Sequence, residues 1–238
     1  MSKTDPQKRV IFFDVVETLF SLQPLETRLS EMQLPAAMAP LFFSQLLRDA
    51  FALQATGSFH TFPEIARGTL EVMLHSSGYR ADDTSIKQIL GVFAELPLHD
   101  DVKPALETLS HSDCQAVLLT NGSRANSEQL VRANGIEHLV DGLISIEDFQ
   151  VWKPCNSLYE QAARAWHCAP QNALLLAAHA WDVHGALSAG LNGIWLQRQD
   201  SVYHPLMHSP HAKVHDMQEA VSRGIDLLMN GSASTRFS

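Results

Sequence analysis

The hydrophobic residues of this chain follow two kinds of pattern, and their order predicts a layered fold. Short continuous apolar runs, typical of strands covered on both faces, occupy residues 9–14, 115–120, 142–146, 173–179 and 193–196. Amphipathic stretches with helical spacing lie at 103–112, 125–134, 155–167, 182–189 and 215–231. Because strands that alternate with helices favour right-handed crossovers, the pattern predicts an α/β fold with a doubly wound parallel, Rossmann-like sheet.

The alternation breaks between residues 21 and 98, where no convincing strand is found. Amphipathic helices are predicted in this segment at 38–54, 62–78 and 84–96. Gly78 is a suitable helix stop, and Pro97 ends the third helix. We therefore expect two domains, an α/β core from residues 1–20 and 99–238 and an all-helical cap from residues 21–98.

Composition and charge narrow the class of partner. The 238 residues are 45% hydrophobic and 18% charged, which is enough to bury a core. The net charge of −9 argues against nucleic acid or an anionic membrane as the main partner. The N-terminal "MSKTDPQKRV" has no apolar signal region, and no apolar run approaches the ~20 residues of a membrane span. Three scattered cysteines predict neither a zinc site nor a disulfide, so we expect a cytoplasmic protein with a small-molecule substrate.

Polar side chains follow four of the predicted strands. They are, in chain order, Asp14, Thr120, Asn121, Lys153, His179 and Asp182. In an open α/β sheet the working crevice lies outside the carboxyl ends of the strands, so these side chains are expected to converge. A lone buried aspartate is more often a structural hydrogen-bond acceptor, but several converging polar strand ends predict an active site, with the helical insertion positioned to cover it.

Four segments resemble, in order, the motifs of the haloacid dehalogenase-like superfamily. They read "FFDVVETLF", "LLTNGS", "VWKPCNSLYEQAA" and "LLLAAHAWDVHGALSAGLNGIWLQR". The helical insertion after the first motif is similar to the superfamily's first type of cap. The stretch "AWD-x-x-G-A" resembles the type II L-2-haloacid dehalogenases, including the branch whose first motif reads D-V-x-E-T. The resemblance covers nearly the whole chain and implies hydrolysis of short-chain L-2-haloalkanoic acids to 2-hydroxy acids.

By this resemblance Asp14 is the catalytic nucleophile. A carboxylate can displace halide from C2 with inversion and leave an ester, which water then cleaves. Lys153 is expected to keep Asp14 ionised and to bind the substrate carboxylate. Asp182 is expected to pair with Lys153 or to fix its loop, and Thr18 and Thr120 offer hydroxyl donors to Asp14 and to the substrate.

Val16 separates this reaction from its main alternative, a Mg²⁺-dependent phosphatase of the same superfamily acting on a small metabolite. Such phosphatases keep a second aspartate two residues after the nucleophile as their general acid/base. Val16 cannot transfer a proton, and Asp182 has no neighbouring acid to complete the oxygen shell that Mg²⁺ favours. We therefore expect no metal and no organic cofactor. A further alternative is a non-catalytic member that binds a ligand or partner through its cap.

Two positions depart from the better-known type II pattern. Glu17 replaces a glycine and His179 an asparagine, while Ala177 and Ala178 stand where that pattern has serines. An imidazole oriented by a carboxylate is a suitable general base near neutral pH. We predict that Glu17 holds His179, which activates the water that attacks the Asp14 ester. The alternative is that Glu17 caps a helix or pairs with a cap arginine, and that His179 only packs.

The arginine that binds the leaving halide in the familiar branch is also absent. Phe43 takes its place in "PLFFSQLLRDAF", and Arg48, five residues on, faces elsewhere on a helix. The halide is therefore expected to meet an apolar and aromatic pocket together with the Asn121 amide. The residues predicted to bind substrate or halide are Val15, Val16, Phe43, Leu46, Phe62, Thr120, Asn121 and Trp181. Ordinary packing between cap and core would explain the apolar ones equally well. Similar proteins are commonly dimers, so the resemblance also allows a homodimer.

Overall fold

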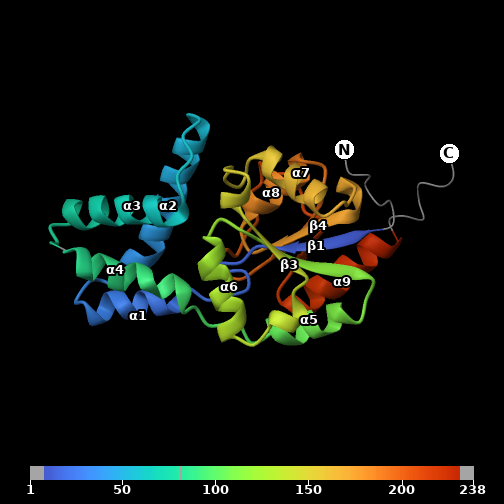
Figure 1. Cartoon of the computed structure of the whole chain (residues 1–238), viewed down its shortest axis with the longest axis horizontal. Helices are drawn as coiled ribbons and strands as arrows, with labels where there is room; N and C mark the ends of the chain where they lie inside the picture. The colour runs from blue at the N-terminus through green and yellow to red at the C-terminus, as the bar shows by residue number, and fades with distance from the viewer. Residues whose placement is uncertain (1–7, 81, 231–238) are drawn as a thin grey trace.

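A parallel sheet forms the centre of the molecule, which we describe from a computed structural model covering residues 8–80 and 82–230. Within these residues the sheet has six strands in the order β3-β2-β1-β4-β5-β6 (Figure 1). The strands are β1 Arg9–Phe13, β2 Cys114–Thr120, β3 Gly142–Ser145, β4 Ala173–Ala177, β5 Asn192–Leu196 and β6 Ala212–Val214. Every neighbouring pair is parallel, so the predicted doubly wound α/β fold is confirmed.

The middle strands are apolar because helices cover both of their faces. Phe13 of β1 pairs with Leu118 of β2 on one side and with Leu176 of β4 on the other, and all three side chains are fully buried. The sequence does not predict β6, because this edge strand buries only Val214 and so leaves no apolar run.

The predicted run at 173–179 is shorter in the structure. Strand β4 ends at Ala177, and the next helix begins at Ala180 rather than at residue 182. His179 is the cap residue of that helix and keeps extended backbone angles. It therefore lies in the turn at the carboxyl edge of the sheet, with its side chain free to face the crevice.

Five helices cover the sheet. They are α5 Val102–Ser110, α6 Arg124–Ala133, α7 Asn156–Ala165, α8 Ala180–Ser188 and α9 Met217–Asn230, each within two residues of its predicted ends. In Figure 1, α7 and α8 lie above the sheet, and α5 and α9 lie below it. Helix α9 packs so closely that a Cβ on Gly224 would come within 2.9 Å of Leu174 and 3.2 Å of Ile11. The glycine in this amphipathic helix is therefore explained by close packing.

Between β1 and β2 the chain is helical, and we call residues 21–98 the helical insert. Its α-helices are α1 Gln23–Glu31, α2 Met38–Ala55, α3 Phe62–Ser76 and α4 Asp83–Gly91. Helix α1 is absent from the sequence prediction because it buries only Leu25 and Leu29, too few to show a helical period. Helix α4 ends at Gly91, earlier than predicted, and a short 3₁₀ turn follows at Val92–Ala94.

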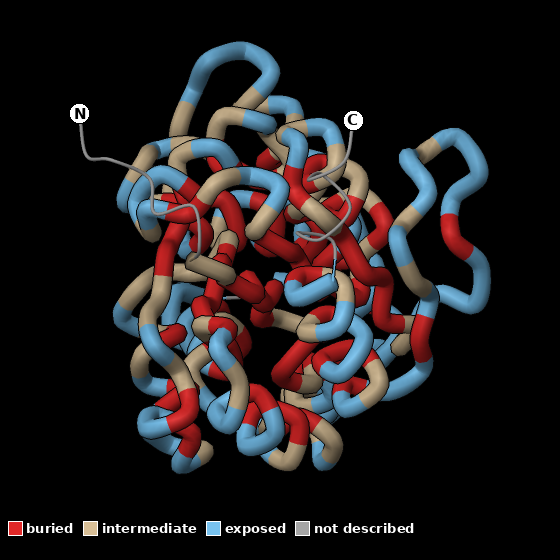
Figure 2. The backbone as a smooth tube through the Cα atoms, turned by 90° about the vertical axis from the view of Figure 1, so that its right-hand side faces the viewer, coloured by how far each residue is buried: buried red, intermediate tan, exposed pale blue. Residues whose placement is uncertain are grey.

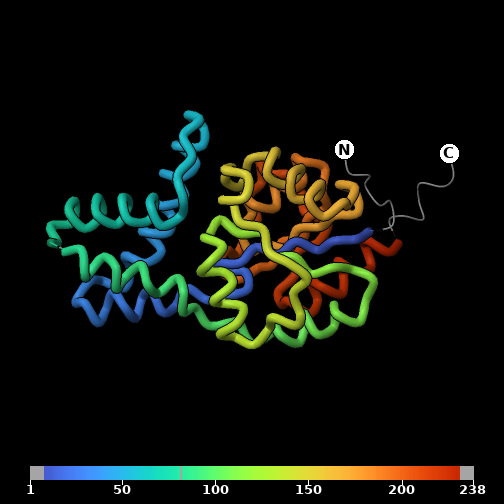
Figure 3. The backbone as a smooth tube through the Cα atoms, viewed as in Figure 1, coloured from blue at the N-terminus to red at the C-terminus, as the bar shows by residue number. Residues whose placement is uncertain are grey.

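Two chain segments join the helical insert to the rest of the molecule, and they run side by side. Phe20 forms an antiparallel bridge with Leu98, and the Ser21 N–H donates to the Pro97 carbonyl at 2.9 Å. Figure 3 shows the insert lying beside the sheet and its helices, and Figure 2 shows buried backbone concentrated in the interior. No helix within the described ranges has the length and apolar character needed to cross a membrane.

Candidate active site

The loop after β1 places Asp14, Glu17 and Thr18 at the carboxyl edge of the sheet. The Asp14 N–H donates to the Leu176 carbonyl of β4 at 3.0 Å, which extends the strand pairing by one residue. Thr18 Oγ1 donates to Asp14 Oδ2 at 2.6 Å and accepts from the Ala178 N–H at 2.9 Å. The hydroxyl donates its single hydrogen to Asp14 and accepts from the backbone after β4, so it fixes the carboxylate relative to the end of that strand.

Lys153 reaches the same carboxylate from the loop after β3. Its side chain is fully buried, and Nζ lies 2.9 Å from Asp14 Oδ1 and 2.6 Å from Asp182 Oδ2. The Tyr159 hydroxyl donates to the other oxygen of Asp182 at 2.5 Å. The Lys153 N–H donates to Asn121 Oδ1 at 3.2 Å, which ties this loop to the end of β2. Such paired acceptors are what a buried ammonium requires, since an unpaired interior charge is costly.

These contacts keep Asp14 ionised. Burial alone would raise the pKa of Asp14, but the Lys153 charge and the hydrogen bond from His179 hold that pKa far below its ordinary value. Burial also works against the Lys153 ammonium, but the charges of Asp14 and Asp182 outweigh it and raise the pKa of Lys153. Asp14 is therefore a carboxylate at neutral pH, which is the form that can act as a nucleophile.

His179 lies between two carboxylates. Its Nδ1 is 3.1 Å from Asp14 Oδ2, and its Nε2 is 2.9 Å from Glu17 Oε2. The predicted contact between Glu17 and His179 is thus present, and His179 does more than pack. Burial disfavours the charged ring, but the hydrogen bonds and charges of the two carboxylates raise the pKa of His179 to about 10. The ring is therefore an imidazolium at neutral pH.

Glu17 occupies a strained backbone conformation. Its φ is +66°, in the left-handed region that costs a non-glycine residue roughly 1–2 kcal/mol. The Glu17 N–H donates to the Phe20 carbonyl at 2.8 Å, which helps to hold this turn. The conformation explains why a glycine suits this position in the better-known pattern. A carboxylate retained here despite the strain points to a functional role for the side chain.

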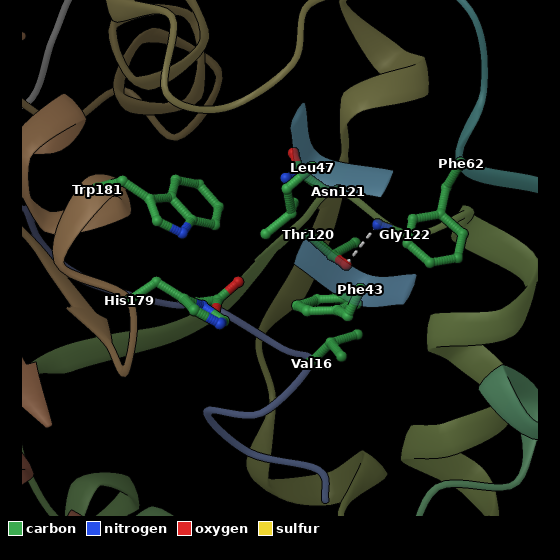
Figure 4. Close-up of a pocket in the computed structure, with 10 residues that line it drawn as sticks. Val16, Phe43, Leu47, Phe62, Thr120, Asn121, Gly122, His179 and Trp181 are labelled. Atoms are coloured by element: carbon green, nitrogen blue, oxygen red, sulfur yellow. Dashed lines mark hydrogen bonds and ion pairs between the residues drawn. The ribbon is translucent and has the colours of Figure 1, made fainter. Parts of the chain in front are cut away.

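Beside Asp14 and His179 lies a narrow cavity under the helical insert (Figure 4). Its free volume is about 20 Å³, room for about one water molecule. The residues around it are Asp14, Val16, Phe43, Leu47, Phe62, Thr120, Asn121, Gly122, His179 and Trp181. In Figure 4, His179 and Trp181 lie on one side, and Phe43 and Phe62 lie on the other. The apolar part of the wall comes from Val16, Phe43, Leu47, Phe62 and Trp181, and the polar groups come from the strand ends.

Aromatic rings pack directly against His179. The Trp181 ring stacks on the imidazole with centroids 5.1 Å apart, and the Phe43 ring lies at 6.1 Å. Phe51 in turn meets the Trp181 ring edge-on at 5.2 Å. Aromatic faces attract a cation, so this packing favours the charged form of the ring.

Most residues predicted to bind substrate or halide do line the cavity, but two do not. Leu46 is fully buried in the hydrophobic core, and Leu47 stands at the cavity instead. The reason is the helical period, because Phe43 and Leu47 are four residues apart in α2 and share one face. Val15 is also buried in the core, and only its neighbour Val16 reaches the cavity.

Lys153, which is predicted to bind the substrate carboxylate, is not among the residues that line the cavity. Its ammonium contacts Asp14 and Asp182, and its role toward substrate stays a prediction. The donors left at the cavity are the Asn121 amide and the Thr120 hydroxyl, whose oxygen already accepts from the Gly122 N–H at 2.8 Å.

Sequence reasoning also missed Tyr159, the hydroxyl partner of Asp182. Tyr159 lies on the apolar face of α7 beside Leu158, Ala162 and Ala163, so its pattern is that of a core residue. The hydroxyl of a tyrosine on an apolar helix face is the one feature that could have indicated this contact, since a fully buried tyrosine usually has a hydrogen-bond partner.

A model of the haloacid dehalogenase-like hydrolases matches residues 8–190, and the chain belongs to this family. At the level of sequence it is similar to an (S)-2-haloacid dehalogenase of Pseudomonas putida, with 26% identity over 88% of this chain and 94% of the relative. A haloacetate dehalogenase of Moraxella sp. (strain B) is 24% identical over 89% of this chain and 95% of the relative.

Solved structures support the same fold. The crystal structure of an L-2-haloacid dehalogenase superposes with a TM-score of 0.86 at 21% identity, covering 91% of this chain and 98% of the other. The L-2-haloacid dehalogenase of Xanthobacter autotrophicus with chloropropionic acid covalently bound gives a TM-score of 0.81 at 18% identity, covering 90% and 97%. At these identities the likeness establishes the fold.

Proposed function

We propose that this protein hydrolyses short-chain L-2-haloalkanoic acids to 2-hydroxy acids through a covalent ester on Asp14. The observation that carries the proposal is the position of the Asp14 carboxylate. It is held ionised by Lys153, contacts the His179–Glu17 pair, and faces a narrow cavity. The activities named for the P. putida and Moraxella relatives support the same reaction.

In the first half of the reaction an oxygen of Asp14 attacks C2 of the substrate and halide leaves. Displacement at carbon needs an ionised nucleophile with little water around it, because hydration would lower its reactivity. The cavity offers such a site. In this proposal the Thr120 hydroxyl orients the substrate carboxylate, and the Asn121 amide with Phe43 and Trp181 surrounds the departing halide; the presence of all four at the cavity supports these roles.

In the second half His179 acts as the general base. With Glu17 accepting the Nε2 hydrogen, the Nδ1 nitrogen faces Asp14 and, once the ring is neutral, can take a proton from a water that attacks the ester. Glu17 fixes the orientation of the ring and stabilises the charge that develops on it. The water adds to Cγ of Asp14, and the 2-hydroxy acid is released.

The helical insert, residues 21–98, is proposed to act as a cap over this site. Phe43, Leu47 and Phe62 come from the insert, Trp181 comes from the first turn of α8, and the remaining lining residues come from the strand ends. The free volume of about 20 Å³ holds about one water, and movement of the insert is proposed to make room for the substrate. The small cavity favours the shortest acids. The cytoplasmic location and the homodimer remain predictions.

Halide release tests the proposal. Purified protein is assayed with L-2-chloropropionate, bromoacetate and longer 2-haloacids, with and without EDTA, and the Asp14→Asn variant is the control. We expect halide release that survives EDTA and is lost in the variant. A mass increase on the Asp14 peptide after rapid quenching would support the ester. Phosphate release from small phosphate esters that requires Mg²⁺, with no halide release, would establish the phosphatase instead.

A further inference from the structure

His179 is held by carboxylates at both ring nitrogens, which leaves neither nitrogen free to accept a proton. Nδ1 faces Asp14 Oδ2 at 3.1 Å, and Nε2 faces Glu17 Oε2 at 2.9 Å. An ionised carboxylate only accepts hydrogen bonds, so each ring nitrogen carries a hydrogen. The aromatic neighbours Phe43 and Trp181 bring no charge to the ring. The resting site therefore contains an imidazolium and not a base.

The charges around the ring favour the same state. Asp14 and Glu17 bring two carboxylates to the ring, while Lys153 offsets the charge of Asp14 from the other side. Burial raises the pKa of Asp182, so the charges that face the ring directly are those of Asp14 and Glu17, and an imidazolium offsets part of them. Because the substrate is itself an anion, the charged ring weakens the repulsion that the substrate meets.

Ester formation changes the surroundings of only one of the two ring nitrogens. An oxygen of Asp14 bonds to C2, the carbon–halogen bond breaks with its electron pair on the halide, and Asp14 becomes neutral. The hydrogen bond and the charge of Asp14, which help to raise the pKa of His179, are then lost, while Glu17 stays in place and burial still disfavours the charge. The Nδ1 hydrogen no longer has an anionic acceptor.

We propose, on the basis of the function proposed above, that His179 gives up its Nδ1 proton when Asp14 is alkylated, so that the proton and the halide are both released before water attacks. The neutral ring keeps its Nε2 hydrogen on Glu17 and turns the Nδ1 lone pair toward the ester. The side chain as a whole is 14% exposed, so part of the ring borders solvent. His179 thus supplies a positive charge during displacement and a base during hydrolysis.

The two halves balance. In the first, the imidazolium, Asp14 carboxylate and haloacid give the neutral ring, the ester, halide and one proton. In the second, water places its oxygen on Cγ of Asp14, one hydrogen on Nδ1 and the other on the alkoxide oxygen as the Cγ–O bond to the substrate breaks. The products are the 2-hydroxy acid, the Asp14 carboxylate and the imidazolium, so the resting site is restored.

A single-turnover experiment tests the timing. Enzyme in excess over bromoacetate is mixed in weak buffer with a pH indicator, and quenched samples are analysed for bromide and for the mass adduct on Asp14. We expect proton release at the rate of bromide release, ahead of the loss of the adduct. A proton that appears only as the adduct disappears would overturn the inference.

An equilibrium measurement decides the matter if the ester is too short-lived for the two steps to separate. The ¹⁵N shifts of the His179 ring are recorded at about pH 8 in the wild type and in Asp14→Asn. The neutral amide of this variant mimics the uncharged ester at position 14. We expect an imidazolium in the wild type and a neutral ring in the variant. A neutral ring in the wild type, or a charged ring in the variant, would overturn the inference.

The His179→Asn spectrum identifies the signal, and His184, a partly buried histidine of α8 stacked on His208, is the internal control because its ring should not respond to Asp14. Failure of the inference and of the proposed function are distinguishable. A folded enzyme that releases no halide and forms no adduct refutes the function, whereas halide release with a late proton refutes only the timing.

Discussion

Glu17 Oε2 lies 2.9 Å from His179 Nε2, and Glu17 makes this contact from a left-handed backbone conformation with φ of +66°. The two residues are 162 positions apart in the chain. They meet because the loops after β1 and β4 leave the same edge of the sheet from neighbouring strands. The site thus combines a strained turn on one strand end with a helix cap residue on the next.

Replacing Glu17 by glycine and by alanine separates strain from chemistry. Both changes remove the carboxylate, so hydrolysis of the ester should fall by about 100-fold or more, while halide release in the first turnover persists. Only glycine adopts the left-handed backbone conformation without strain. The free energy of unfolding of Glu17→Gly should therefore exceed that of Glu17→Ala by about 1 kcal/mol. Rapid-quench kinetics and urea unfolding measure the two effects. Equal stability of the two variants would show that the turn is not strained.

Lys153→Met should be strongly destabilising, because it removes the cation shared by Asp14 and Asp182 and leaves Asp182 buried without a charged partner. Breaking a buried ion pair on one side costs about 3–5 kcal/mol. The loss should shrink as the pH is lowered toward about 4, since the unpaired carboxyls then take up protons at little cost. Thermal unfolding across this pH range measures the effect, with the exposed Lys103→Met of α5 as the matched control. A pH-independent loss would contradict the ion-pair explanation.

Phe43→Leu should widen the cavity and extend the range of substrates. Phe43 lines the cavity from α2, whereas its neighbour Phe42 is fully buried and does not reach the cavity. We therefore expect Phe43→Leu to raise kcat/KM for longer 2-haloacids relative to bromoacetate. Phe42→Leu should lower stability by about 1 kcal/mol without changing that ratio. If both variants shift the ratio alike, Phe43 does not set substrate size.

Because of His179, the stability of the folded protein should fall as the pH rises above neutrality. Its pKa is raised from 6.5 to about 10 in the folded chain, so its contribution is complete below the unfolded pKa of 6.5 and is lost as the pH rises to about 10. The free energy of unfolding of the wild type relative to His179→Gln should therefore decline between these values, by an amount on the order of a few kcal/mol. Urea unfolding at intervals of pH measures the decline. A difference that grows with pH would contradict the raised pKa.

The sequence allowed the chemistry of the site to be predicted better than its shape. Asp14, Lys153 and His179 were found because the ends of parallel strands meet at one edge, a rule that needs no side-chain detail. The sequence prediction names Leu46 and not Leu47 as a cavity residue. A helix turns by about 100° per residue, so an error of one position moves a side chain to another face of the helix. The depth of Lys153 could not be predicted, since spacing along a loop does not say how far a long side chain is buried.

The weak elements of the fold were missed for a related reason. Helix α1 and strand β6 bury few residues, so neither leaves a periodic apolar signal. Tyr159 is missed for a different reason. Its ring fits the apolar face of α7, so the hydrophobic pattern does not reveal the hydroxyl that contacts Asp182. Many residues contribute to a packing pattern, so packing can be predicted from the sequence. A polar contact depends on a single atom and leaves no such pattern.

The strand order β3-β2-β1-β4 also bears on when the site is completed during synthesis. Asp14 follows β1, its ammonium partner Lys153 follows β3, and Asp182, which holds that ammonium, lies in α8 after β4. A growing chain that has not reached Asp182 lacks part of the ion-pair network around Asp14. The network is therefore completed only after four of the six described strands have been made.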